Sequence, residues 1–403
     1  MRVLHVIPSV DERSGGPATA IVPMCRALMA YGIEVLLVTT DAGSEQAVRK
    51  EDMPSLARDF KSVPTMFFPS QLGESFKYSR PLATWLRSNI DHFGLTHIHA
   101  VFNHSSVAAA HWCRKAGVPY VIRPLGTLDP WSMAQKSLRK KVFWQVSGKR
   151  MLRDAAAVHY TSEAEKRATE ELFGLSHGKV VPLGVDGETP TTFSKDQLAE
   201  YSPILGFDPY VLVMSRLNPK KGLDVLIEAF LKLAEDSRFA RWRLVIAGDG
   251  PAGYVSKLQR QAASSSHRER ILFTGWLEGE KKAALLGGAS LLVLPSHQEN
   301  FGLSVMEAMC NSVPVLVSPY VNLADEIDSA GAGWIAPVEK HALAAMLAQA
   351  LIDDLELEQR GRAARQLSGK YSWEATARGL TRLYGEILST DYTDYADLEK
   401  QSV

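Results

Sequence analysis

The sequence predicts an α/β protein made of two doubly wound domains. Its 403 residues exceed the roughly 100–200 residues of one typical domain, which favours two. Hydrophobic residues make up 46% and charged residues 22%, which is typical of globular proteins and excludes disordered or coiled-coil chains. Short apolar runs alternate with longer helical patterns, and such runs are buried on both faces of a parallel sheet. The alternation therefore predicts two parallel sheets with helices on both faces.

The expected strands are short runs rich in valine, isoleucine and leucine. In the first half they are Val3–Ile7, Val35–Thr39, His97–Val101, Tyr120–Arg123, Val158–Tyr160 and Lys179–Val181. In the second half they are Val211–Met214, Arg243–Ala247, Ile271–Phe273, Leu291–Leu294 and Val313–Val317. Sheets of this kind bind ligands at the carboxyl ends of their strands, so residues after each strand are the functional candidates.

The domain boundary is expected between Gly184 and Phe207, where glycines and prolines stand among polar residues. We therefore expect an N-terminal domain at residues 1–187, a linker at 188–206 and a C-terminal domain at 207–372. Residues 373–403 begin with an amphipathic helical pattern and end in a polar tail. Residues 44–79 are poorly periodic and are expected to form a mobile loop.

Charge and cysteine content exclude several classes of protein. Lys+Arg and Asp+Glu both number 45, so the chain lacks the overall basic charge of a nucleic-acid-binding protein. The three widely spaced cysteines predict neither a disulfide framework nor a zinc site, which favours a reducing cytosol. The N-terminus lacks a signal-peptide pattern, and the longest nearly apolar run, Ala283–Pro295, is too short to span a bilayer. We expect a cytoplasmic protein.

Two loops could bind phosphate. Gly15 and Gly16 follow the first strand and open a helix, whose free N–H groups could face a phosphate; the alternative is a tight turn. Arg216 and Lys221 follow the first strand of the second half. A forked guanidinium and a mobile ammonium suit a diphosphate, and the alternative is a solvated basic loop.

A third candidate element runs from Glu299 to Glu307. Gly302 and Leu303 lie where a helix should begin, so their N–H groups are available to phosphate or sugar oxygens. The two carboxylates could accept hydrogen bonds from paired hydroxyls, or could be a helix cap and a surface charge. Because Glu307 lies in an apolar stretch, we expect it to have a partner.

The remaining candidates are less specific. His99 and His104 flank the end of one expected strand and could be structural or catalytic. Residues 131–153 carry seven lysines and arginines, no acid, and interleaved aromatic and apolar residues. This pattern could rest on an anionic membrane surface, or could be a solvated helix with its aromatics packed inward.

Taken together and in this order, these residues resemble the retaining glycosyltransferases of family 4, which have the GT-B fold. The resemblance covers nearly the whole chain and is densest in the second half, where it includes the Ser-Arg-Leu…Lys-Gly run, Ala247–Pro251, Phe273–Trp276 and the two glutamates eight residues apart. It implies two Rossmann-like domains facing each other across a deep cleft. It also implies that the helix at 373–403 packs back on the N-terminal domain.

The resemblance assigns roles to individual residues. Arg216 and Lys221 would grip the donor diphosphate, Glu299 would contact the donor sugar, and Glu307 would bind the ribose hydroxyls. The other donor contacts that it implies are Gly15, Gly16, Gly248, Trp276, Leu277, Phe301, Gly302 and Leu303. Many family members place a histidine near the transferred sugar, but Leu125–Thr127 contains none. His104 is the nearest substitute as a catalytic residue.

The expected reaction moves a sugar from a nucleoside diphosphate, UDP-glucose or a related UDP-sugar, to an acceptor hydroxyl with retention. The chain has no Asp-x-Asp motif, so we expect neither a metal nor a cofactor. The acceptor would be a carbohydrate or a lipid-linked glycan, as in surface polysaccharide or glycolipid synthesis, and residues 131–153 could hold the enzyme peripherally at the inner face of the plasma membrane. The alternatives are a non-catalytic nucleotide-sugar-binding protein and an NAD-type dehydrogenase, which the missing Gly-x-Gly-x-x-Gly motif disfavours.

Overall fold

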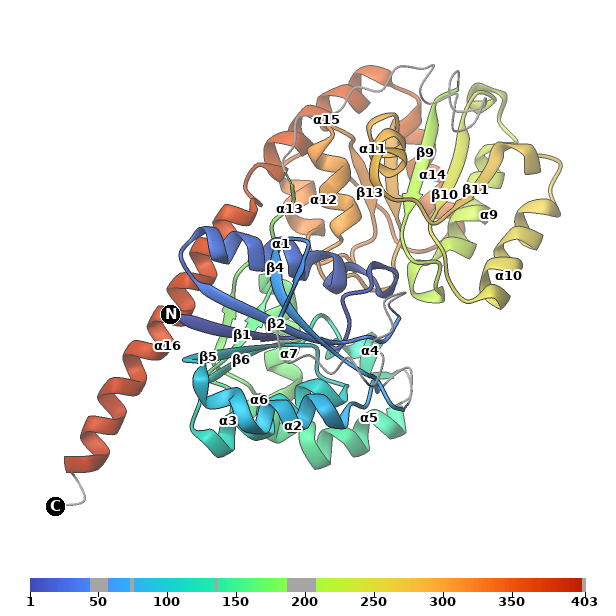
Figure 1. Ribbon diagram of the computed structural model, residues 1–403. Coiled ribbons are helices and arrows are strands. Elements are labelled where there is room, and N and C mark those ends of the chain that lie inside the picture. Colours follow the sequence, from blue (N-terminus) through green and yellow to red (C-terminus); the bar gives the residue numbers. More distant parts are fainter. Residues whose placement is uncertain (44–56, 73–75, 135–136, 187–207, 401–403) are drawn as a thin grey trace. The chain divides into compact units, whose positions relative to one another are not determined.

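The computed structural model describes residues 1–43, 57–72, 76–134, 137–186 and 208–400, and the chain divides into two units (Figure 1). Unit 1 comprises Met1–Gly184 together with Trp373–Val403, and unit 2 comprises Val185–Ser372. The expected linker at 188–206 lies outside the described residues.

Unit 1 contains a sheet with the strand order β3-β4-β2-β1-β5-β6-β7-β8, in which every neighbouring pair except β3–β4 is parallel. Its strands are β1 (Arg2–Val6), β2 (Glu34–Thr40), β3 (Arg58–Phe60), β4 (Val63–Phe68), β5 (Leu95–His99), β6 (Tyr120–Arg123), β7 (Ala157–Tyr160) and β8 (Gly178–Val180). The direction of strand succession reverses between β1 and β5, where open α/β sheets form their ligand crevice.

β3 and β4 correct one sequence expectation, because they lie within residues 44–79, which were expected to form a loop. β4 is almost wholly buried but contains Pro64, and a proline within a strand weakens the sequence signal. Pro64 is tolerated here because it faces the short antiparallel strand β3 at the edge of the sheet. Residues 44–56 and 73–75 of that stretch lie outside the described residues.

The helices of unit 1 cover both faces of its sheet (Figure 1). They are α1 (Gly16–Ala30), α2 (Arg80–Asn89), α3 (His104–Ala116), α4 (Pro130–Ala134), α5 (Ser137–Phe143), α6 (Lys149–Arg153), α7 (Glu163–Phe173) and α16 (Trp373–Lys400). α2, α3 and α6 pack on one face, where Leu4, Ile98 and Ile122 join a continuous apolar core. Side chains alternate along a strand, so His5, His97, His99 and Arg123 lie on the opposite face.

α16 covers this opposite face together with α1, and the two helices pack side by side. Thr376 Oγ1 donates to the carbonyl of Pro182 at 3.0 Å, and Tyr384 is fully buried with its hydroxyl 2.7 Å from His97 Nδ1. The C-terminal helix is thus part of the fold of unit 1.

Unit 2 has a fully parallel sheet with the order β11-β10-β9-β12-β13-β14. Its strands are β9 (Tyr210–Met214), β10 (Arg243–Ala247), β11 (Ile271–Gly275), β12 (Leu291–Leu294), β13 (Val315–Val317) and β14 (Gly333–Ile335). The sequence did not predict β14, a three-residue strand that begins with glycine. Strand succession reverses between β9 and β12, which predicts a ligand crevice at their carboxyl ends.

The helices of unit 2 flank this sheet and bury a second core. They are α9 (Leu223–Leu233), α10 (Ala252–Ala263), α11 (Gly279–Gly287), α12 (Leu303–Cys310), α13 (Ala324–Ser329), α14 (Lys340–Leu351) and α15 (Asp354–Ser368). α9 presents Leu223, Ile227 and Phe230 to the core, where it packs against α14. The packed helix fixes the loop between β9 and α9, which carries Arg216 and Lys221.

Candidate functional site

The loop after β9 is braced by a side-chain cap and by a close backbone contact. Asn218 Oδ1 accepts from the amide of Lys220 at 3.1 Å and caps a short 3-10 turn, Pro219–Lys221. Gly222 ends the turn in the left-handed region with φ +63°, and a Cβ there would overlap the carbonyl oxygen of Pro295. Glycine is therefore needed where this loop touches the end of β12, and the contact places Lys221 at the strand reversal.

The loops after β10 and β11 are joined to the same edge. The amide of Leu217 donates to the carbonyl of Asp249 at 2.8 Å, and the amide of Gly248 donates to that of Gly275 at 2.8 Å. A Cβ at Gly248 would overlap the carbonyl oxygen of Ser215, so close packing between loops already explains this glycine. Beyond β11, Trp276 is half-buried and donates through Nε1 to Glu278 Oε1 at 2.5 Å, with the half-buried Leu277 beside it.

Glu299 lies on a rigid segment after β12. Its amide donates to the carbonyl of Tyr320 at 2.9 Å, and its carbonyl accepts from the amide of Asn322 at 3.0 Å. Its carboxylate pairs with Lys221 Nζ, and the two side chains are only 17% and 14% exposed. Burial alone would raise the pKa of Glu299, but the charge and hydrogen bond of Lys221, with the charges of Lys220 and Arg216, hold this pKa below its ordinary value. The carboxylate is therefore ionised and surrounded by cations.

The start of α12 adds uncapped backbone N–H groups to this site. Gly302 precedes the helix in the left-handed region, with φ 71° and ψ 60°, and has no side chain to cap the first turn. Phe301 is buried, with its ring edge-on to Tyr371 at 5.8 Å between centroids, and Leu303 begins the helix. The start of this eight-residue helix lies beside Glu299, which pairs with Lys221, so its free N–H groups and this cation form a region suited to an anion.

Glu307, in the middle of α12, has the partner that its apolar setting requires. Lys282 of α11 donates to Glu307 Oε1 at 2.6 Å. Sequence reasoning missed this lysine, because 25 residues separate it from Glu307. Lys282 fixes one carboxylate oxygen of Glu307.

The structure brings Arg216, Lys221, Glu299 and the start of α12 together in unit 2, whereas three other predicted site residues belong to unit 1. Gly15 has φ +111° and Gly16 begins α1, as expected of a strand-to-helix turn. His104 begins α3, and its Nδ1 accepts from the amide of Ser79 at 3.3 Å. Burial lowers the pKa of His104, so its ring is a neutral side chain with one nitrogen engaged.

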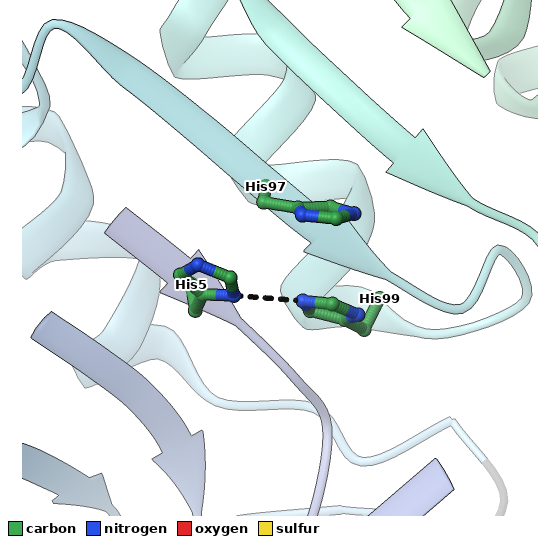
Figure 2. Close-up of side chains that lie close together, drawn as sticks. All are labelled: His5, His97 and His99. Carbon is green, nitrogen blue, oxygen red and sulfur yellow. Dashed lines mark hydrogen bonds between the residues drawn. The ribbon is translucent and has the colours of Figure 1, made fainter. Parts of the chain in front are cut away.

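Unit 1 also contains a group of buried histidines that the sequence did not bring together (Figure 2). One ring nitrogen from each of His5, His97 and His99 lies within 4.8 Å of the others, as a metal site would require. The rings of His97 and His99 are stacked, however, with centroids 4.3 Å apart, so their nitrogens do not converge on one point.

Hydrogen bonds occupy most of these ring nitrogens. His5 Nδ1 lies 3.1 Å from His99 Nε2. His97 Nδ1 lies 2.7 Å from the hydroxyl of Tyr384, and His97 Nε2 lies 3.3 Å from His159 Nδ1. Burial lowers the pKa of His5 and of His159 to about 3, and burial with neighbouring positive charge lowers those of His97 and His99 well below the ordinary value. The group is a neutral polar network beneath α16.

The described residues of the basic segment at 131–153 separate into an inner and an outer face. Phe143 and Trp144 point inward and pack against Phe102 and Phe173, with centroids 5.1 and 4.1 Å apart. On the outer face, Leu138, Val142 and Val146 are 75%, 57% and 76% exposed, and we call these three residues the apolar stripe. Phe143 and Trp144 are therefore structural, and the exposed apolar surface comes from the aliphatic residues.

Within the described residues, no helix combines the length and the apolar character needed to cross a bilayer.

Comparison with known families identifies both halves of the chain. Residues 195–367 match the family model of glycosyl transferases group 1, and residues 15–185 match that of the glycosyl transferase 4-like domain. The chain belongs to the group 1 glycosyltransferases. The candidate site of this glycosyltransferase lies inside the first of these matches.

Two curated relatives illustrate its place in the family. The chain is 28% identical over 272 residues to D-inositol 3-phosphate glycosyltransferase of Nocardia farcinica, a match that covers 64% of this chain and 58% of that protein. It is 31% identical over 193 residues to alpha-D-kanosaminyltransferase of Streptomyces kanamyceticus, covering 47% of this chain and 49% of that protein. The chain therefore spans about half the length of these relatives.

Solved structures share the GT-B fold over almost the entire chain. Sucrose-phosphate synthase from Thermosynechococcus elongatus has a TM-score of 0.78 at 18% identity, covering 96% of this chain and 99% of that one. Anabaena HepE in complex with UDP-glucose has a TM-score of 0.76 at 20% identity, covering 97% and 100%. At these identities the likeness shows the GT-B fold alone.

Proposed function

We propose that this glycosyltransferase moves a sugar from a UDP-sugar to an acceptor hydroxyl, with retention at the anomeric carbon and without a metal. The observation that carries the proposal is the grouping of Arg216, Lys221 and Glu299 beside the uncapped start of α12, at the strand reversal of unit 2. Cations and backbone N–H groups at such an edge suit a diphosphate.

The proposed chemistry follows from where charge develops. As the bond between sugar and phosphate breaks, negative charge grows on the departing diphosphate and the sugar becomes oxocarbenium-like. Arg216, Lys221 and the N–H groups at Gly302 and Leu303 stabilise that charge, which is the role a divalent cation has in other transferases. Glu299 binds a hydroxyl of the donor sugar, and Glu307, held by Lys282, binds the ribose.

Retention is proposed to occur by attack on the same face from which the diphosphate departs. A covalent intermediate would require a free carboxylate beneath the anomeric carbon, whereas Glu299 and Glu307 each pair with a lysine. In the proposed route the acceptor oxygen forms the new bond to the anomeric carbon. The leaving phosphate oxygen accepts the proton of the acceptor hydroxyl, so no further base is required.

UDP-glucose is the first donor to test, because HepE, which shares the fold, was solved in complex with it. In a thermal-shift panel of nucleotide sugars with excess EDTA, a ligand that binds only the folded protein raises the Tm. We expect UDP-glucose or a related UDP-sugar to give the largest shift, with donor hydrolysis unaffected by EDTA. Lys221→Ala should lose the shift, while Lys257→Ala, a substitution at a surface ion pair, should keep it.

Two outcomes would contradict the proposal. Hydrolysis that depends strictly on an added divalent cation would overturn the proposal that Arg216, Lys221 and the N–H groups at Gly302 and Leu303 stabilise the departing diphosphate without a metal. A donor that binds but is neither hydrolysed nor transferred in the presence of any acceptor would favour the non-catalytic nucleotide-sugar-binding alternative.

We further propose that the enzyme works at an anionic membrane surface, on an acceptor such as a lipid-linked glycan or a growing surface polysaccharide. The apolar stripe supports this, because its three side chains repeat every four residues and are exposed. Lys141 and Lys149 are exposed beside it, and Arg150 and Arg153 pair with Asp154. Aliphatic residues flanked by cations fit the boundary between acyl chains and anionic headgroups.

A further inference from the structure

Arg123, the last residue of β6, is a buried cation without a partner in the part of the chain that the structure describes. It is 2% exposed, and its guanidinium forms no ion pair or hydrogen bond with any described residue. Its Nε is fully enclosed without an acceptor there. The carboxylate of Glu165 acts on Arg123 only from a distance, because its oxygens accept from the amides of Gly126 and Thr161 at 2.9 Å and from Thr161 Oγ1 at 3.0 Å.

Arg270 shows how this fold satisfies a buried guanidinium when its role is structural. It is 6% exposed, and it donates to the carbonyls of Trp242 and Ala234 at 3.1 Å and also to that of Phe239. Arg123 has no such carbonyl acceptors among the described residues. A buried charge without a partner is costly, and a ligand that supplied the missing acceptors would lower this cost.

Arg123 lies next to the strand reversal of unit 1, where an open sheet forms its ligand crevice. His99 is its register partner on β5, so both side chains project from the same face of the sheet. His99 Nε2 faces His5, and Figure 2 shows the second ring nitrogen on the side away from His5. That nitrogen, Nδ1, is buried and has no partner within the described ranges, and β6 lies on that side of β5.

The protonation of the histidines decides what this pair of residues can bind. A neutral imidazole carries one N–H, and burial, together with the positive charge of Arg123, keeps the pKa of His99 well below its ordinary value. When His5 Nδ1 donates to His99 Nε2, His99 carries its proton on Nδ1. His99 Nδ1–H and Arg123 Nε–H are then two donors on neighbouring strands, beside one fixed positive charge.

We propose that Arg123 and His99 form a subsite for an oxyanion, a phosphate or carboxylate group, carried by the acceptor. Oxygen acceptors with negative charge satisfy both orphaned donors and neutralise the guanidinium. The subsite lies within unit 1 and uses none of the residues assigned to the donor. Its assignment to the acceptor rests on the proposed transfer reaction, whereas the oxyanion binding itself does not.

The test measures binding of three probes to the full-length protein by calorimetry: glucose 6-phosphate, inorganic phosphate and glucose. Lys221→Ala serves as the background, because it removes the main cation of the donor site. We expect glucose 6-phosphate to bind at least 10-fold more tightly than glucose and several-fold more tightly than inorganic phosphate. Arg123→Met should abolish the preference over glucose. In the otherwise wild-type chain, Arg123→Met should leave the affinity for UDP within twofold.

Stability separates a binding role from a structural one. Arg123→Met should leave the Tm unchanged or raised, since it removes an uncompensated charge, whereas Arg270→Met should lower it by several degrees. If Arg123→Met folds poorly, Arg123→Lys provides a second test. This variant keeps the charge but loses the Nε donor, so it should retain part of the preference for glucose 6-phosphate over glucose. Oxyanion binding that survives in Arg123→Met, or a Tm loss equal to that of Arg270→Met, would overturn the subsite. Equal affinity for inorganic phosphate and glucose 6-phosphate would overturn its assignment to the acceptor. Failure of UDP binding with intact oxyanion binding would count against the proposed function alone.

Discussion

Lys221→Ala removes the cation that pairs with Glu299, and the structure allows its two consequences to be separated. Breaking a fully buried ion pair costs about 3–5 kcal/mol, because one charge is left uncompensated. Here the side chains of Lys221 and Glu299 are 14% and 17% exposed, and the charges of Arg216 and Lys220 still act on the carboxylate. We therefore expect the substitution to lower the free energy of unfolding by a smaller amount, about 1–3 kcal/mol.

Catalysis should respond differently, because the charge on the leaving diphosphate develops in the transition state. Losing one preorganised donor costs about 2.7–4 kcal/mol, or about 100–1,000-fold in kcat. Glu299→Gln should also destabilise the protein, since Lys221 then lacks its carboxylate. Adding Glu299→Gln to Lys221→Ala should restore part of the stability, with a coupling free energy of at least about 1 kcal/mol. The double variant should regain no activity.

The assay combines urea unfolding of the wild-type protein and the three variants with the rate of UDP release from the donor that binds best. Lys257→Ala is the control for loss of a surface lysine. A rate for Lys221→Ala within a few-fold of the wild type would contradict the catalytic role of this lysine. A double variant that is as unstable as the sum of the single variants would count against the ion pair, because the pair would then have no energetic coupling.

Two further predictions concern unit 1. Replacing Leu138, Val142 and Val146 by serine should abolish flotation with vesicles that contain phosphatidylserine. Serine at Ile352 and Leu355, two exposed residues of unit 2, should leave flotation unchanged. Equal binding of the wild-type protein to purely zwitterionic vesicles would contradict the charge argument. The buried histidines should make the protein acid-sensitive: their pKa values lie below 6.5 in the folded state, so their stabilisation is complete above pH 6.5 and is lost as the pH falls from 6.5 toward 3. Each histidine contributes up to about 1.4 kcal/mol per pH unit to the slope of the free energy of unfolding against pH, measured by urea unfolding. His5→Leu should reduce this slope, whereas His92→Gln, at an exposed position, should not. An unchanged slope in His5→Leu would refute the assignment.

Parallel strands were the feature most readily predicted, because burial on both faces leaves continuous apolar runs. The strand ends then located the loops after β9 and β12, which is why Arg216, Lys221 and Glu299 could be named from the sequence. β4 escaped because Pro64 interrupts its pattern, and β14 because it has three residues and begins with glycine. In both strands, tertiary pairing overrides a weak local signal.

Contacts between distant elements could not be predicted in the same way. The pairing of Lys282 with Glu307 joins two helices, and nothing in the spacing of these residues distinguishes it from a surface charge. Gly248 could be read as a ligand contact, but its carbonyl neighbour shows that loop packing already requires a glycine there. The unsatisfied state of Arg123 emerges only when the acceptors around every buried guanidinium are known, because burial and partnership are properties of the folded chain.

The charges gathered in unit 2 suggest how the proposed site lowers the barrier to departure of the nucleotide. Three cations, Lys220, Lys221 and Arg216, act on one carboxylate, Glu299, so these four groups carry a net charge of 3 − 1 = +2. A UDP-sugar carries two negative charges at its diphosphate, whereas the departing UDP carries more. Cations that already balance the donor therefore interact more strongly with the product-like transition state, which is the differential binding that lowers a barrier. The negative charge of Glu299 weakens the attraction between these cations and UDP. Without it, the same cations would bind UDP more tightly and slow its departure.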